Sequence, residues 1–90
     1  MDKKDILKAL IAAIEAVQEE SGEEPVEITL DTIPMSDLPG FESLRSFEAI
    51  SVFEEKLNLE LPENPFLDAH GSMSIRELAE VVYTRIDTRN

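Results

Sequence analysis

The chain has 90 residues, enough for one domain with a modest core and too few for a core plus a deep catalytic cleft. Twenty acidic residues against eight basic ones give a net charge of -12 and a pI near 4.3, so the surface repels phosphate backbones and anionic membranes. The absence of cysteine excludes disulfides and thiolate metal sites. We therefore expect residues 1–90 to form a single cytoplasmic domain, a monomer, with no nucleic-acid binding and no membrane insertion.

The first predicted element is a helix over residues 5–20. Ile6, Leu10, Ile14 and Val17 recur at helical spacing and give the segment one apolar stripe. Ser21 and Gly22 follow as a C-terminal stop signal. The stripe is expected to face the core.

Residues 23–41 form a long connection. Part of it alternates apolar and polar side chains as a strand does, but the sequence offers no partner strand for its backbone hydrogen bonds. We expect an ordered loop that packs onto the helices through four apolar side chains. These are Val26, Ile28, Ile33 and Leu38. A loop this long in a compact domain is usually either functional or evidence against the assignment.

A second long helix is predicted over residues 43–57. Its apolar residues recur every three or four positions and give one apolar face. They are Leu44, Phe47, Ile50, Phe53 and Leu57.

Two more helices follow. Asn64 and Pro65 are a cap and a first-turn proline, which predicts a short helix over residues 66–69. Ser74 and Glu77 form a capping box that opens a last helix through about Ile86. The expected fold is all-α, a small bundle of three main helices plus one short helix, with a long loop between the first and second helices.

The chain lacks the usual signatures of catalysis. No Gly-rich phosphate loop and no His-Glu-x-x-His pair are present. A calcium loop is excluded as well, because Asp31, Asp37 and Asp68 do not lie at the alternating positions that such a loop needs. His70 is the only histidine and is expected on the surface beside Gly71. We therefore expect neither a metal site nor an enzyme.

Ser43 has two readings. Serine is among the best N-caps, and Ser43 is expected to cap the second helix, although Ser46 stands where a capping box needs Glu or Gln. A helix N-terminus also offers unpaired amides and a positive dipole end, which suit a phosphate ester on that hydroxyl. The residues alone leave both roles open.

The segment Glu42-Ser43-Leu44 resembles the acyl carrier proteins. Their hallmark is an acidic residue, a serine and a leucine at the start of the second helix. Asp37-Leu38 and Gly40 before this motif, and Glu48 and Phe53-Glu54-Glu55 after it, extend the likeness. The helix order, size and acidity of most of the chain agree with that family.

The resemblance implies that Ser43 is esterified with 4'-phosphopantetheine, transferred from coenzyme A by a phosphopantetheinyl transferase. The thiol of the arm would hold acyl groups as thioesters for fatty-acid, lipid, lipopolysaccharide or polyketide synthesis. The partners would be acyl-transferring and acyl-modifying enzymes with basic docking patches. The expected docking residues are Leu44, Arg45, Glu48, Glu54 and Glu55. Leu44, Phe47, Ile50 and Phe53 would either pack in the core, the favoured role, or line a cleft for the acyl chain.

Three departures indicate a specialised carrier. Glu42 replaces the usual aspartate, Pro39 looks like an insertion, and Arg45 occupies a position that is often acidic. Arg45 is close enough in sequence to pair with the prosthetic phosphate. The alternatives are a noncatalytic acidic adaptor without the arm and an aminoacyl carrier. The second ranks lower, because the glycine pair and histidine that often precede the serine of peptidyl carriers are absent.

Overall fold

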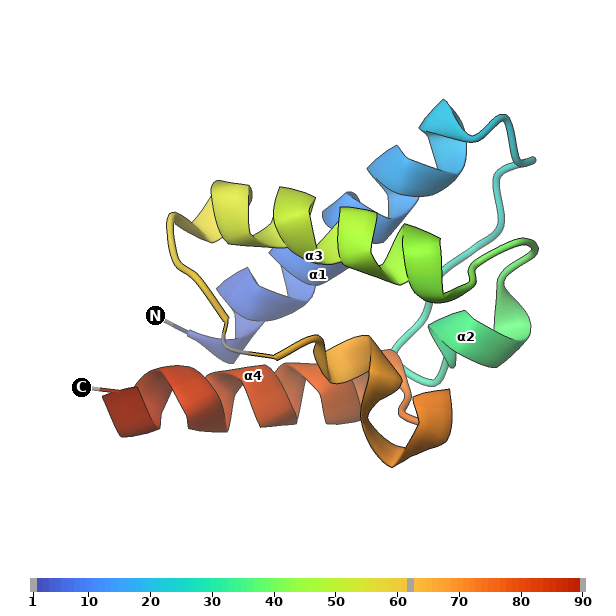
Figure 1. The fold of residues 1–90 in the computed structure, drawn as a ribbon. Coiled ribbons are helices and arrows are strands. Elements are labelled where there is room, and N and C mark those ends of the chain that lie inside the picture. The colour runs from blue at the N-terminus through green and yellow to red at the C-terminus, as the bar shows by residue number, and fades with distance from the viewer. Residues whose placement is uncertain (1, 62, 90) are drawn as a thin grey trace.

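The computed structural model describes residues 2–61 and 63–89, apart from the side chains of residues 68, 69 and 87–89. The described residues form helices and connections (Figure 1). In chain order these are α1 (Lys3–Glu20), α2 (Pro34–Asp37), α3 (Ser43–Leu57), the 3-10 helix η1 (Pro65–Gly71) and α4 (Ile75–Arg89). The predicted all-α bundle of three main helices and a short one is confirmed.

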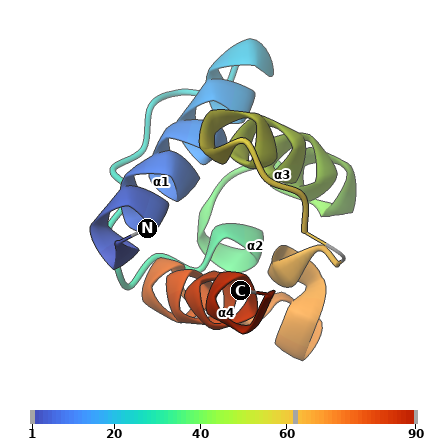
Figure 2. The same ribbon diagram turned by 90° about the vertical axis from the view of Figure 1, so that its left-hand side faces the viewer.

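The core lies between the three long helices. α1 packs against both α3 and α4, and α2 closes the end of the bundle where α3 and α4 begin (Figures 1 and 2). The main side chains of the core are Ile6, Leu10, Ile14 and Val17 of α1, Ile50 and Phe53 of α3, and Ile75, Leu78 and Val82 of α4. Burial of each large apolar side chain contributes about 1.5–3 kcal/mol, so the predicted stripe of α1 holds the bundle together.

Helix bounds agree closely with the sequence pattern. α3 spans the predicted residues, α1 begins at Lys3, and α4 continues to Arg89. The short helix α2 was not predicted. Pro34 opens it, and Asp37 Oδ2 accepts a hydrogen bond of 2.7 Å from the Ile33 amide. One turn of helix leaves too little periodicity to detect in a sequence.

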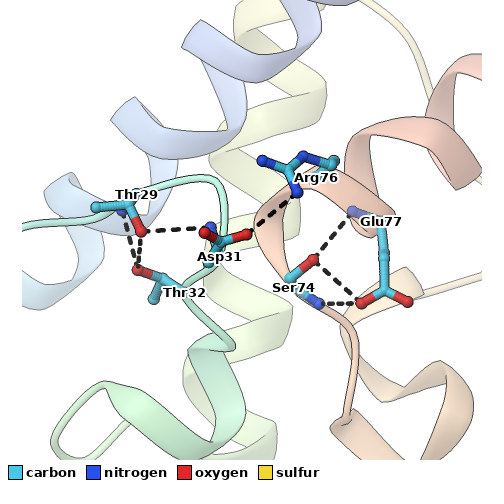
Figure 3. Close-up of polar contacts among 6 residues, drawn as sticks. All are labelled: Thr29, Asp31, Thr32, Ser74, Arg76 and Glu77. Atoms are coloured by element: carbon cyan, nitrogen blue, oxygen red, sulfur yellow. Dashed lines mark hydrogen bonds and ion pairs between the residues drawn. The ribbon is translucent and has the colours of Figure 1, made fainter.

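The long connection finds its hydrogen-bond partners at the start of α4. The carbonyls of Leu30 and Thr32 accept bonds of 3.0 and 2.9 Å from the amides of Arg76 and Ile75. Thr29 and Thr32 bond to each other, and Asp31 pairs with Arg76 at 3.2 Å (Figure 3). The connection is therefore ordered, as expected, although α2 interrupts it, and its backbone completes the N-terminus of α4.

The packing expected of that loop is partly wrong. Leu38 is buried, and Ile28 packs partly buried against the core. Ile33 is half-buried, but Val26 is 45% exposed.

The capping box at α4 forms as predicted (Figure 3). Ser74 Oγ accepts a hydrogen bond of 3.3 Å from the Glu77 amide, and Glu77 Oε1 accepts one of 3.0 Å from the Ser74 amide. The bonds from the Ser74 backbone and then its hydroxyl lower the pKa of Glu77 below its ordinary value of 4.5.

Candidate functional site

The start of α3 places Ser43 one position inside the helix. Glu42 is the N-cap residue, with extended backbone and no side-chain cap, and its carbonyl accepts the 2.9 Å bond from the Ser46 amide. The predicted capping role of Ser43 is therefore wrong. The buried ring of Phe41 packs edge-to-face on Phe66, with ring centroids 5.4 Å apart, and this contact anchors the chain just before the helix.

The Ser43 side chain is exposed, and its hydroxyl has no hydrogen-bond partner among the described residues. The first amides of a helix have no intrahelical partner, and no described side chain caps those of α3. An exposed hydroxyl thus stands beside unsatisfied donors at the positive end of a helix dipole.

A buried polar chain joins this turn to η1. Ser46 is fully buried, and its hydroxyl donates a 2.6 Å bond to the carbonyl of Ser43. Asn64 Nδ2 donates a 3.0 Å bond to Ser46 Oγ, and Asn64 Oδ1 accepts one of 3.0 Å from the Phe66 amide. The backbone of Ser43 is therefore fixed from the buried side of α3, while its side chain is exposed to solvent.

Arg45 joins the same turn to the end of α1. Its Nη1 lies 3.1 Å from Gln18 Oε1 and 3.3 Å from both Glu23 Oε2 and the Pro39 carbonyl. Gln18 Nε2 also donates a 2.8 Å bond to that carbonyl.

The turn is close-packed around this guanidinium. Gly40 has φ +70°, and a Cβ there would lie 2.5 Å from Arg45 Nη1. The Arg45 side chain is 23% exposed and engaged within the protein, so pairing with a prosthetic phosphate, which stays a prediction, would compete with these contacts.

Two large apolar side chains of α3 face outward. Leu44 is 72% exposed and Phe47 is 53% exposed, so the core packing expected of them is wrong, whereas Ile50 and Phe53 are buried as expected. The buried side of α3 centres on Ser46 and Phe53. At about 100° per residue, Leu44 and Phe47 are turned away from it.

The remaining docking candidates divide into two groups. Glu48 and Glu55 are exposed on the same side as Leu44 and have no ion pair among the described residues. Glu54 is half-buried and accepts a 2.6 Å bond from the Leu61 amide, so it fastens the chain after α3. The structure leaves Leu44, Glu48 and Glu55 open to a partner and uses Arg45 and Glu54 internally.

Other kinds of site have little support in the described ranges. His70 is exposed at the end of η1, as expected. No cluster of three or more potential metal ligands occurs among the described residues, and the side chain of Asp68 lies outside them. No described helix is long and apolar enough to cross a bilayer.

Comparisons of the chain with protein-family models, with curated proteins and with solved structures give no match. The resemblance to acyl carriers therefore rests on the sequence motif around Ser43 alone.

Proposed function

We propose that the protein is an acyl carrier in which Ser43 bears 4'-phosphopantetheine. The observation that carries the proposal is the exposed hydroxyl of Ser43 on the first turn of α3, which has no hydrogen-bond partner in the part of the chain that the structure describes. The helix does not use this hydroxyl as a cap, so attachment of a group there removes no hydrogen bond between described residues. The acyl group would be held as a thioester on the thiol of the arm.

The attachment step needs a second protein. Ser43 Oγ attacks the phosphorus that bears the pantetheine of coenzyme A, and the P–O bond to 3',5'-ADP breaks. The 3',5'-ADP leaves with the bonding electron pair, while the hydroxyl proton passes to a base of the transferase. No described residue of this chain hydrogen-bonds to Ser43 Oγ as a base would.

The start of α3 suits the product of this step. The new phosphodiester carries one negative charge beside the unpaired first-turn amides. At an exposed helix N-terminus such a charge is favoured by about 0.3–1 kcal/mol. The Ser46–Asn64 chain keeps the backbone of this turn fixed while the arm moves.

The exposed side of α3 is the proposed docking face for the transferase and the acyl enzymes. Leu44 and Phe47 supply apolar anchors, and Glu48 and Glu55 supply negative charge that pairs with no described cation. A matching partner has an apolar depression bordered by arginine and lysine. Apolar contacts would provide affinity and the charges would speed encounter in a salt-sensitive way.

The test is the intact mass of the chain after incubation with coenzyme A, magnesium and a phosphopantetheinyl transferase. We expect one phosphopantetheine addition to the natural chain and none to Ser43→Ala. Ser51→Ala is the matched control, because Ser51 is also an exposed serine of α3. It should be modified like the natural chain.

Absence of the addition with several transferases, or full addition to Ser43→Ala, would contradict the proposal. An unmodified chain in cells, together with normal partner binding by Ser43→Ala, would instead support the acidic adaptor.

A further inference from the structure

A second surface lies between the latter half of α1 and the long connection, and its described lining contains no residue of α3. It is a cavity of about 370 Å³, which we call the α1 groove. Val26, Ile28 and Leu38 supply its apolar lining. Leu38 and Ile28 belong to the edge of the core, and Val26 leaves 45% of its surface exposed. The groove therefore offers apolar contact that no described part of the chain covers.

The border of the groove is acidic, and most of its carboxylates lack an ion pair with a described residue. Glu15, Glu19 and Glu24 line it, are exposed, and have no ion pair among the described residues. Glu23 also lines it but already pairs with Arg45 at 3.3 Å. Three carboxylates that pair with no described cation thus share the lining of the groove with its apolar floor.

The position on α1 adds to this negative potential. Glu15 and Glu19 are four residues apart and repel each other along the helix. The C-terminal end of a helix favours cations, yet the last turn of α1 has no basic residue. Arg45 of α3 already lies at the end of α1, so a cation bound at the border would chiefly relieve the repulsion between Glu15 and Glu19.

We propose that the α1 groove binds a basic segment of a partner protein that carries an apolar side chain between lysine or arginine residues. The apolar side chain, or the alkyl stem of a lysine, would lie on Val26 and Ile28 while the cationic groups meet the carboxylates. The volume is near the lower end of ligand pockets, about 300–1,000 Å³, which suits a few side chains. The site does not depend on Ser43 or on the proposed arm.

The test uses the 90-residue chain and a short capped peptide of repeated Lys-Leu-Arg triplets, with NMR shifts and titration calorimetry as readouts. We expect the largest shifts at Val26, Ile28 and Glu19. Val26→Ser and Glu19→Lys should each weaken binding about tenfold, and binding should weaken further as salt is added.

Glu27→Lys is the matched control. Glu27 is exposed and adjacent to Val26 but does not line the groove, so it repeats the charge change of Glu19→Lys outside the site. A peptide of Lys-Ser-Arg triplets keeps the charge and removes the apolar contact. Both changes separate a built site from general attraction to an acidic protein. We expect Glu27→Lys to bind nearly as well as the natural chain, and the serine peptide to bind much more weakly.

Five results would overturn the proposal. Four are equal binding of the two peptides, equal loss in Glu27→Lys and Glu19→Lys, shifts centred on Leu44 and Phe47, and no binding at all. The fifth is displacement of the peptide by spermine with the same shifts, which would assign the groove to small polycations. Melting curves of each variant establish that a change in affinity is not a loss of fold.

Discussion

Helices α3 and α4 both begin beside a serine, but they use it differently. Ser74 stands just before α4, and its hydroxyl accepts a bond from the Glu77 amide at 3.3 Å. Ser43 stands one position further in, so Glu42 takes the N-cap position and the Ser43 hydroxyl is left without a partner among the described residues. A shift of one residue thus separates a structural serine from one that is open to chemistry.

The two helix starts are also held by different neighbours. α4 receives the carbonyls of Leu30 and Thr32 from the long connection. α3 is held through Ser46, three residues after Ser43, and through Arg45. At α3, Ser46 and Arg45 therefore hold the helix start, while Ser43 is left for the proposed function. At α4, Ser74 itself stabilises the helix start.

The largest effect on folding is expected for Ser46→Ala. The change removes the bond to the Ser43 carbonyl and leaves Asn64 Nδ2 without its partner. An unsatisfied group of this kind costs about 1–3 kcal/mol. Urea unfolding measures the loss in the free energy of unfolding. Ser51→Ala, on the exposed side of the same helix, should change it by less than about 0.5 kcal/mol. Equal losses in the two variants would show that the buried chain does not hold α3.

A smaller difference in the free energy of unfolding should separate the alanine variants of the two serines at the helix starts. Ser74→Ala removes the cap of α4 and should lower the free energy of unfolding by about 1 kcal/mol. Ser43→Ala removes no hydrogen bond of the described structure and should lower it by less than about 0.5 kcal/mol. Thermal and urea unfolding at neutral pH measure both. A loss in Ser43→Ala as large as that in Ser74→Ala would mean that Ser43 is a cap after all.

The smallest expected effect is a pH dependence of the stability that the capping box contributes through Glu77. The pKa of Glu77 is lowered in the folded protein from its ordinary value of 4.5, so folding favours its ionised form. Its contribution is fully present above pH 4.5 and is lost as the pH falls through the lowered folded-state pKa. The natural chain should exceed Glu77→Gln in stability at neutral pH, and the difference should shrink in acid. A difference independent of pH down to complete acid unfolding would contradict this assignment.

Much of the fold could be predicted because its signals are local. The bounds of α3 follow from apolar spacing and from Asn58, which ends the helix in a left-handed conformation at φ 53°. The capping box of α4 lies within four residues. Helix α2 was not predicted, because a single turn is too short to show a period. The hydrogen bond from the Ile33 amide to Asp37 carries no strong sequence signal either.

The candidate site was less predictable. The sequence identified Ser43 but placed Phe47 in the core, because a period of three to four cannot tell which side of a helix its neighbours cover. The spacing of Ser46, Ala49, Ile50 and Phe53 was the available signal for the true buried side. The partners of Arg45 lie 6 to 27 residues away in the chain, at distances that no local pattern encodes.

The sequence by itself determined an acidic all-helical domain, the position of the long helices and the serine on which the proposed function depends. These features follow from composition, from helical spacing and from caps, all of which act between near neighbours. Tertiary structure decided that Glu42 rather than Ser43 occupies the N-cap position of α3, that Leu44 and Phe47 face outward, and that Arg45 faces inward. It did so because Phe41 packs on Phe66 while the Pro39 carbonyl bonds to Gln18 of α1 and to Arg45, and these contacts set where α3 begins and which side it buries.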